Sequence, residues 1–208
     1  MTEAEAQAWL AADVSRETWD RLVTFAEALV KWQKAINLVA PGSLDALWQR
    51  HFLDSAQIFP LRQQDAGLWL DLGSGGGFPG LVCAILAAEK APELRFTFIE
   101  SDLRKGSFLR DVARQTGVRI SVLTRRIEDA PAQNAAVISA RALAPLGRLC
   151  ELAAPHLAAD GICLFQKGAN HATELDVARG EWHMKVTEVE SQTAAGAVIY
   201  KIEELARV

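Results

Sequence analysis

Cysteine and histidine are scarce in this chain of 208 residues, which has three cysteines and four histidines. The cysteines (Cys83, Cys150 and Cys163) show no C-x-x-C spacing and lie in apolar runs, which is typical of buried, reduced thiols in a cytoplasmic protein. No two histidines are four residues apart and none is paired with a cysteine, so the sequence predicts no metal site.

Long apolar runs and an export signal are also missing. Acidic residues stand in the first segment, MTEAEAQAWLAADVS, where a signal peptide has basic ones. No run reaches the roughly 18 apolar residues that a membrane span requires. Half of the residues are hydrophobic and 23% are charged, which is the composition of an ordinary folded domain. We therefore expect a protein without a membrane anchor, and nothing in the sequence demands more than a monomer.

The first sixty residues have helical signals. Thr2 and Glu5 have the spacing of a capping box, and Ser15 can cap a longer helix whose apolar residues recur at about 3.6 positions. Pro41 and Gly42 interrupt this pattern, and a further helix is expected over 43–58. We expect residues 1–61 to form a helical extension that packs on a domain comprising residues 62–208.

From residue 67 onward, apolar strands alternate with amphipathic helices. Strands are expected at 68–72, 96–100, 119–123, 135–139 and 161–166, and helices at 78–88, 103–115 and 145–157. This alternation predicts an α/β fold with a doubly wound parallel sheet. The segments 184–190 and 197–202 flank a short turn and predict an antiparallel hairpin at one edge.

A glycine-rich loop follows the first expected strand, over 71–80 (DLGSGGGFPG). Such a loop allows close approach of a nucleotide cofactor to the backbone. The stretch from Gly75 to Gly80 fits the dinucleotide pattern G-x-G-x-x-G, whereas Asp71-x-Gly73-x-Gly75 is similar to the first motif of class I S-adenosylmethionine methyltransferases. The antiparallel last strand favours the methyltransferase over an NAD-dependent oxidoreductase. Glu100, at the end of the second strand, can accept hydrogen bonds from ribose hydroxyls in either fold.

The sequence lacks the residues that two kinds of methyl transfer usually require. The segment after the fourth strand is Ser139-Ala-Arg-Ala, not the Asn/Asp-Pro-Pro-Tyr/Phe motif of exocyclic amine methylation. Methylation of a pyrimidine at carbon 5 needs a nucleophilic cysteine at the end of a strand, but Cys150 falls within a helix and Cys163 within a strand. The remaining acceptors need little activation, such as the lone pair of a guanine N7 or an acidic oxygen.

Six segments in order are more specific than any single motif. They are HFLDS at 51–55, LDLGSGGGFPG at 70–80, KGSFLR at 105–110, RIE at 126–128, SARA at 139–142 and QKG at 166–168. Together they closely resemble the RsmG (GidB) family, whose members methylate a guanine N7 in bacterial 16S (small-subunit) ribosomal RNA. The resemblance covers nearly the whole chain. It implies S-adenosylmethionine as cofactor and small-subunit RNA or the 30S particle as partner.

The resemblance also implies site residues. The family's cofactor contacts fall on Gly73, Phe78, Ile127, Glu128 and Arg141, where Phe78 and Ile127 would pack near the adenine and Arg141 would meet the carboxylate of the cofactor. From the general fold we add Gly75 and Glu100. The loop reads Gly-Gly-Gly where relatives often have Gly-Pro-Gly, and SARA replaces the commoner Ser-Arg-Ala, so the role of Arg141 depends on the alignment.

Three further residues are candidates for orienting the substrate. His51 and Asp54 are one helical turn apart and share a face; they form a polar pair near the cofactor or, alternatively, brace the N-terminal helices on the sheet. Lys167, at the end of the fifth strand, contacts phosphate or guanine unless it is simply solvated. No catalytic base is assigned.

The net charge of −4 is unusual for a protein that binds nucleic acid. The segment 101–126 nevertheless has seven basic and two acidic residues. Its basic side chains either form a solvated face or bind the RNA backbone, and the candidates for RNA binding are Arg104, Lys105, Arg110, Arg125 and Arg126. The alternatives to an RNA methyltransferase are a small-molecule or protein methyltransferase on the same fold, and a non-catalytic RNA-binding assembly protein.

Overall fold

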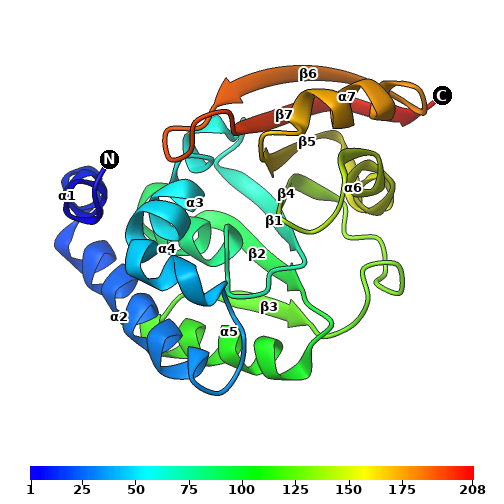
Figure 1. The fold of residues 1–208 in the computed structure, drawn as a ribbon. Helices are drawn as coiled ribbons and strands as arrows, with labels where there is room; N and C mark the ends of the chain where they lie inside the picture. Colours follow the sequence, from blue (N-terminus) through cyan, green and yellow to red (C-terminus); the bar gives the residue numbers. More distant parts are fainter.

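The computed structural model describes all residues, 1–208, and has an α/β fold with one sheet and helices on both of its faces (Figure 1). Its seven strands have the order β3-β2-β1-β4-β5-β7-β6. The first five pair in parallel, and β7 pairs antiparallel with both β5 and β6. The strands are β1 (Ala66–Leu72), β2 (Glu93–Ile99), β3 (Ile120–Leu123), β4 (Ala135–Arg141), β5 (Leu157–Lys167), β6 (Trp182–Glu190) and β7 (Val198–Arg207). The predicted parallel sheet and the antiparallel hairpin are both confirmed.

Helices fill the connections and the N-terminal segment. The α-helices are α1 (Glu3–Asp13), α2 (Arg16–Gln33), α3 (Asp54–Ala56), α4 (Gly80–Lys90), α5 (Leu103–Thr116), α6 (Leu146–Ala153) and α7 (His171–Arg179). Shorter turns are η1 (Pro41–Ala46), η2 (Trp48–Leu53), η3 (Phe59–Leu61) and η4 (Ala154–His156). None of the helices is both long enough and apolar enough to cross a membrane.

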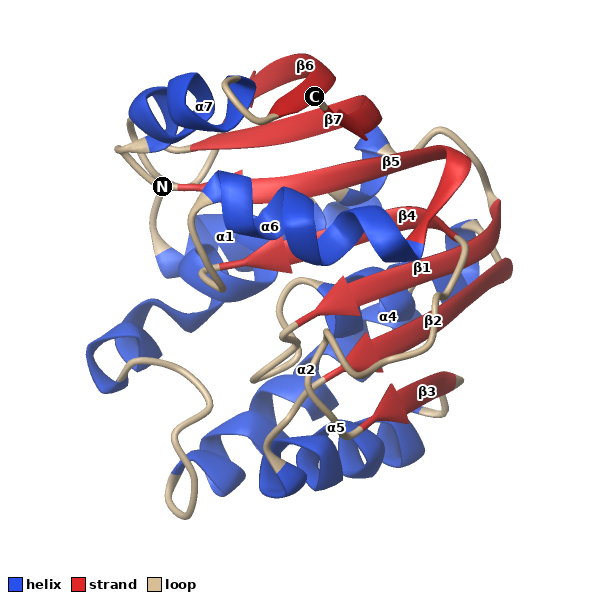
Figure 2. Ribbon diagram, turned by 90° about the vertical axis from the view of Figure 1, so that its right-hand side faces the viewer, coloured by secondary structure: helices blue, strands red, loops and turns tan.

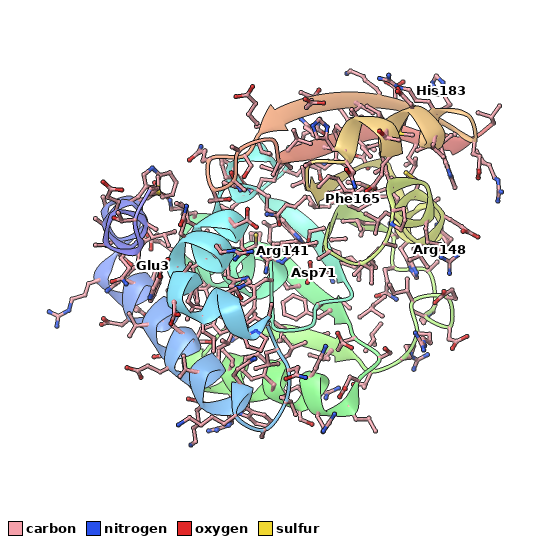
Figure 3. All side chains as sticks on the ribbon, viewed as in Figure 1. Glu3, Asp71, Arg141, Arg148, Phe165 and His183 are labelled. Carbon is pink, nitrogen blue, oxygen red and sulfur yellow. The ribbon has the colours of Figure 1, made fainter.

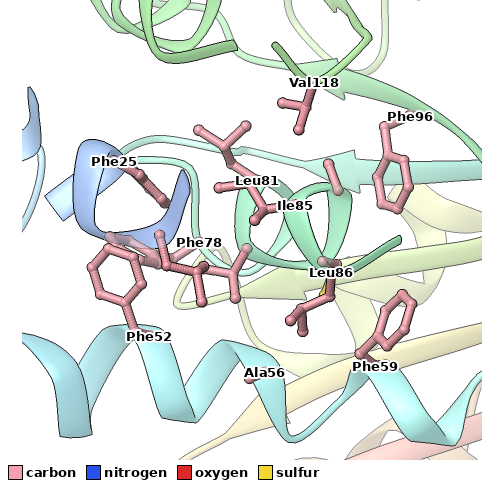
Figure 4. Packing of buried hydrophobic residues seen from close by; sticks show 14 of the residues in the cluster. Phe25, Phe52, Ala56, Phe59, Phe78, Leu81, Ile85, Leu86, Phe96 and Val118 are labelled. Carbon is pink, nitrogen blue, oxygen red and sulfur yellow. The ribbon is translucent and has the colours of Figure 1, made fainter. Parts of the chain in front are cut away.

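Each face of the sheet has its own core, because alternate side chains of a strand point to opposite sides. Trp69 of β1 and Phe98 of β2 belong to a cluster with α2, α4 and α5, whereas Leu70 and Ile99 belong to a second cluster with α6 and α7. Figure 2 shows α6 in front of the sheet with α4 and α2 behind it. The N-terminal helices contribute to the first cluster, where the rings of Phe25 and Phe78 stack 5.1 Å apart (Figure 4).

The predicted helix caps are present. Thr2 and Glu5 exchange both hydrogen bonds of a capping box, and the Ser15 hydroxyl accepts from the Thr18 amide. The single helix predicted over 43–58 is wrong in detail, since the segment consists of a 3-10 turn, the π-helical turn η2 and the short α3. Helix α7 was not predicted, and α4 begins at Gly80 rather than Phe78, after a cis Phe78–Pro79 bond.

Candidate functional site

The glycine loop lies where the sheet order reverses, between β1 and α4. Strands β2 and β4 flank β1, so this is the switch point at which α/β proteins bind ligands. The Gly73 amide donates to the Ile99 carbonyl at 2.9 Å, and Gly75 donates to Glu100 Oε2 at 2.8 Å. Gly73 has a φ of +64°, and a Cβ there would lie 2.7 Å from Leu143. The loop is therefore held against the end of β2 in a conformation that favours glycine.

A cavity of about 430 Å³ opens beside this loop. We call it the cofactor cavity, because six of the seven predicted cofactor residues line it: Gly73, Gly75, Glu100, Ile127, Glu128 and Arg141. Its volume is in the range of small-molecule sites. Glu100 is buried, and each of its oxygens accepts one backbone N–H, from Gly75 and from Asp102, which leaves further acceptor capacity toward the cavity. The glycines of the loop allow close approach of a ligand to the backbone, the Glu100 carboxylate can accept hydrogen bonds from ribose hydroxyls, and Ile127 provides an apolar wall for an adenine.

Phe78 does not line this cavity, contrary to the expected packing on the adenine. Its ring is 5% exposed and stacks on His51, with the ring centroids 5.0 Å apart. The Arg141 guanidinium lies over the same ring, 5.1 Å from its centroid. In this structure Phe78 is part of the core below Arg141 and supports it from one face.

The guanidinium of Arg141 is held by the helical segment that contains His51 and Asp54 (Figure 3). It donates to Asp54 Oδ2, His51 Nδ1 and the Arg50 carbonyl, at 2.8 to 2.9 Å. Asp54 also accepts from Gln57, Gln166 and Thr193. The predicted pair therefore does share a face, and it both braces the N-terminal segment and holds a residue of the cofactor cavity.

The hydrogen bonds of His51 define its tautomer. Arg141 is a donor only, so Nδ1 must accept, and Nε2 carries the hydrogen toward Ser43 Oγ at 2.7 Å. Ser43 in turn donates to the Ala40 carbonyl at 2.7 Å. Burial, together with the charges of Arg141 and Arg50, lowers the pKa of His51 from 6.5 to about 3. The ring is thus a neutral acceptor at physiological pH.

This depressed pKa predicts a pH-dependent contribution to stability. Below pH 6.5 the unfolded chain protonates His51, but the folded chain does so only near pH 3, so stability falls as the pH decreases through this window. Relative to His51→Gln, the wild type should lose up to about 1.4 kcal/mol of unfolding free energy per pH unit below 6.5. Urea titrations of both proteins at pH 4 to 7 measure this difference. A difference that does not change with pH would contradict the assignment of His51 as neutral in the folded protein.

A comparison with a variant is needed because Asp71 acts in the opposite direction. This carboxyl group at the end of β1 is fully buried, and burial raises its pKa from 3.8 to about 6 despite a hydrogen bond from Ser139. Its contribution to stability is lost as the pH rises from 3.8 to 6.

Asp71 is part of a buried chain of hydrogen bonds, in which Trp69 Nε1 donates to Ser139 Oγ at 2.8 Å and Ser139 donates to Asp71 Oδ1 at 2.5 Å. This chain fixes β4 against β1 beneath the glycine loop, and sequence spacing gave no sign of it.

A second cavity of about 660 Å³ adjoins the first, since Arg141 and Ala142 line both. We call it the acceptor cavity. Besides Arg141 and Ala142 at the end of β4, its walls come mainly from three places that are distant in sequence: residues 49–57, the end of β5 with residues 168–170, and the turn between β6 and β7 with the start of β7. The turn is fixed to the N-terminal segment, because Thr193 donates to Asp54 and Gln192 donates to Gln57. The two cavities form adjacent chambers along the carboxyl ends of β1, β4 and β5.

Lys167 lines the acceptor cavity but is not solvated. Its side chain is 9% exposed and pairs with Glu174 at 2.5 Å, while donating to the Ala144 carbonyl. Arg141 is likewise paired, with Asp54. Arg50 is the exposed cation of this cavity, and no carboxylate lies within 4 Å of it. Arg50 was not among the predicted residues, and the helical spacing around His51 would have been the signal for it.

The predicted RNA-binding residues divide into two groups. Lys105, Arg125 and Arg126 line the cofactor cavity, and none of them forms an ion pair. Arg104 pairs with Asp102 over 3.8 Å, and Arg110 donates to Val122 and Thr124 at the end of β3.

None of the three cysteines lines either cavity, and all are buried. Burial raises the pKa of Cys150 to about 12 and those of Cys83 and Cys163 well above their usual range. Across residues 1–208, no group of three or more His, Cys, Asp or Glu side chains is arranged to hold a metal ion.

Comparison with known proteins gives consistent matches. The family described as rRNA small subunit methyltransferase G (GidB) matches residues 18–202. Proteins named ribosomal RNA small subunit methyltransferase G are 53% identical in Ruegeria sp. (strain TM1040), over 96% of this chain and 97% of that one, and 50% identical in Cereibacter sphaeroides (strain ATCC 17025 / ATH 2.4.3), over 100% of both.

Solved structures match the fold at low identity. A ribosomal protein L11 methylase from Lactobacillus delbrueckii subsp. bulgaricus has a TM-score of 0.59 and 16% identity, over 74% of this chain and 78% of that one. A SAM dependent methyltransferase from Aquifex aeolicus has a TM-score of 0.57 and 15% identity, over 84% of this chain and 98% of that one. The sheet is that of the class I S-adenosylmethionine-dependent methyltransferases, as expected.

Proposed function

Because the chain belongs to the rRNA small subunit methyltransferase G (GidB) family, we propose that it methylates a guanine N7 of small-subunit ribosomal RNA with S-adenosylmethionine. The observation that carries this proposal is the pair of cavities that meet at Arg141 and Ala142. S-adenosylmethionine would supply the electrophilic methyl group from the cofactor cavity. Glu100 would accept the ribose hydroxyls, the backbone of residues 127 and 128 would contact the adenine, and the acceptor cavity would hold the guanine.

The hydrogen bonding around the acceptor cavity supports an acceptor that needs no deprotonation. Each potential base is already engaged: Asp54 accepts four side-chain hydrogen bonds, and Glu174 accepts from Lys167 and the Leu146 amide. His51 uses both ring nitrogens. A guanine N7 has a free lone pair, so alignment of the reactants is the main contribution required of the protein.

The alternatives are separated by one transfer assay. The purified protein is incubated with methyl-labelled S-adenosylmethionine and 30S particles, or their naked RNA, from a strain lacking this methylation. We expect label that ribonuclease releases and protease does not. Label in protein or in a low-mass acceptor would favour another methyltransferase activity, and cofactor binding with no transfer to any acceptor would favour a non-catalytic RNA-binding protein.

Arg125 and Arg126 are proposed to contact RNA phosphates at the rim of the cofactor cavity. Replacing both with alanine should weaken RNA binding and reduce the salt dependence of the binding constant by about two phosphate contacts. Filter binding of RNA between 50 and 200 mM salt measures both effects. Arg16→Ala with Arg179→Ala removes two exposed arginines from α2 and α7 as a matched control. Reduced cofactor affinity with unchanged RNA binding would assign the pair to the cofactor instead.

A further inference from the structure

A third hollow lies outside the site described above, between α1, α2 and the start of η2. This groove has a volume of about 560 Å³. Trp19 and Trp48 form part of its wall, with their rings stacked 4.9 Å apart and inclined by 27°. Val30 lies in the same lining and is 45% exposed, so it extends the apolar surface beside the two rings. The groove therefore presents aromatic and aliphatic surface to solvent.

Two lysines give the groove a positive rim. Lys31 and Lys34 are three residues apart on one side of α2 and are both exposed, and no carboxylate lies within 4 Å of either ammonium group. Glu27 is the one acidic residue of the lining, so the groove has a net charge of +1. Apolar stacking surface next to unpaired cations suits an unpaired nucleotide, whose base and phosphate have these two requirements.

The groove and the acceptor cavity are lined by consecutive residues of one segment. Leu47 and Trp48 line the groove, and the next two residues, Gln49 and Arg50, line the acceptor cavity. Two residues span at most about 7 Å, so one short segment of backbone contributes to the walls of both hollows. Arg50, with its unpaired guanidinium, follows directly after the residues that line the groove. A strand with one nucleotide in the acceptor cavity would meet Arg50 and then the groove.

We propose that the groove binds an unpaired base of the RNA substrate close to the target nucleotide. The base packs on the apolar wall beside Trp19 and Trp48, Lys31 and Lys34 bind its phosphates, and Arg50 binds the phosphate between the two hollows. Stacking on aromatic side chains is tolerant of sequence, so the site selects an accessible strand rather than a particular base. The inference rests on the proposed function, because it takes the RNA in the acceptor cavity as its starting point.

The test uses two variants of the full chain. Lys31→Gln/Lys34→Gln removes the charges, and Val30→Asp places a carboxylate in the lining at a position that is 45% exposed. Each is assayed for direct binding of naked small-subunit RNA, for KM and kcat of methyl transfer, and for cofactor binding. The matched control, Lys185→Gln/Lys201→Gln, removes two lysines of β6 and β7 that line neither the groove nor the cavities.

We expect both variants to raise the RNA dissociation constant and KM about 3- to 30-fold, with kcat and cofactor affinity within twofold of the wild type. In the lysine variant, the binding constant should also depend less steeply on salt concentration, by the amount expected for the loss of about two phosphate contacts. Wild-type RNA binding by both variants would overturn the inference and leave the proposed function intact. Unchanged binding of naked RNA with reduced methylation of 30S particles would assign the groove to a protein partner. If the wild type transfers no methyl group to any RNA, the proposed function is refuted. In that case the RNA dissociation constants of the variants still test the groove, and values equal to that of the wild type would refute RNA binding there.

Discussion

Asp54→Ala is expected to lower the free energy of unfolding by about 3 to 5 kcal/mol, the usual cost of removing one partner of a buried ion pair. The side chains of Asp54 and Arg141 are only 16% and 17% exposed. Without the carboxylate, the Arg141 guanidinium loses its counter-charge, and Gln57, Gln166 and Thr193 each lose an acceptor. Urea unfolding at pH 7 measures this loss directly.

Thr193→Val is the control for this prediction. It removes one of the four donors to Asp54 and leaves the ion pair in place, so its cost should be about 0.5 to 1.5 kcal/mol. Asp54 joins the N-terminal segment to β4, β5 and the turn between β6 and β7. If Asp54→Ala costs no more than Thr193→Val, this carboxylate does not hold the two cavities together.

Glu100→Ala is expected to weaken cofactor binding about 10- to 150-fold. The carboxylate accepts the Gly75 and Asp102 amides, and it is the acceptor proposed for the ribose hydroxyls. Hydrogen bonds to a charged group contribute about 1.5 to 3 kcal/mol, and 1.4 kcal/mol corresponds to a tenfold change in affinity. Calorimetry with S-adenosylhomocysteine measures the dissociation constant without turnover.

Glu93→Ala is the control. It removes an exposed carboxylate at the start of β2, the strand that Glu100 directly follows, and is expected to leave cofactor binding unchanged. Glu100→Gln should fall between the two, because an amide retains one acceptor oxygen. Equal affinities for Glu100→Ala and the wild type would show that the cofactor lies elsewhere.

Local chemistry explains which parts of the fold were predictable. Strands β1, β4 and β5 contain apolar runs that are followed by glycine or a charged residue, and the caps at Thr2 and Ser15 depend on residues three positions away. Helix α7 was missed because it buries only Leu175 and Ala178, too few to form an apolar stripe. The π-helical turn η2 was missed because its apolar residues also fit a period of 3.6.

The candidate site was predictable only where neighbours in sequence act together. The spacing of His51 and Asp54 placed them on one face, but their partner Arg141 is 87 positions from Asp54. The ion pair of Lys167 depends on α7, a helix whose sequence has no apolar stripe. Phe78 lies within the glycine loop, yet its surroundings are rings from α2 and η2. Contacts between distant segments decide the role of each of these residues.

The most direct test of the central claim is to locate the transferred methyl group. Small-subunit RNA methylated by the protein is treated with borohydride and aniline, which cleave the strand at N7-methylguanosine, and the break is mapped by primer extension. We expect one cofactor-dependent break, at a guanine, that is absent when the protein is omitted. Methylated RNA that shows no such break, or a methyl group on another atom or base, would rule out methylation at guanine N7.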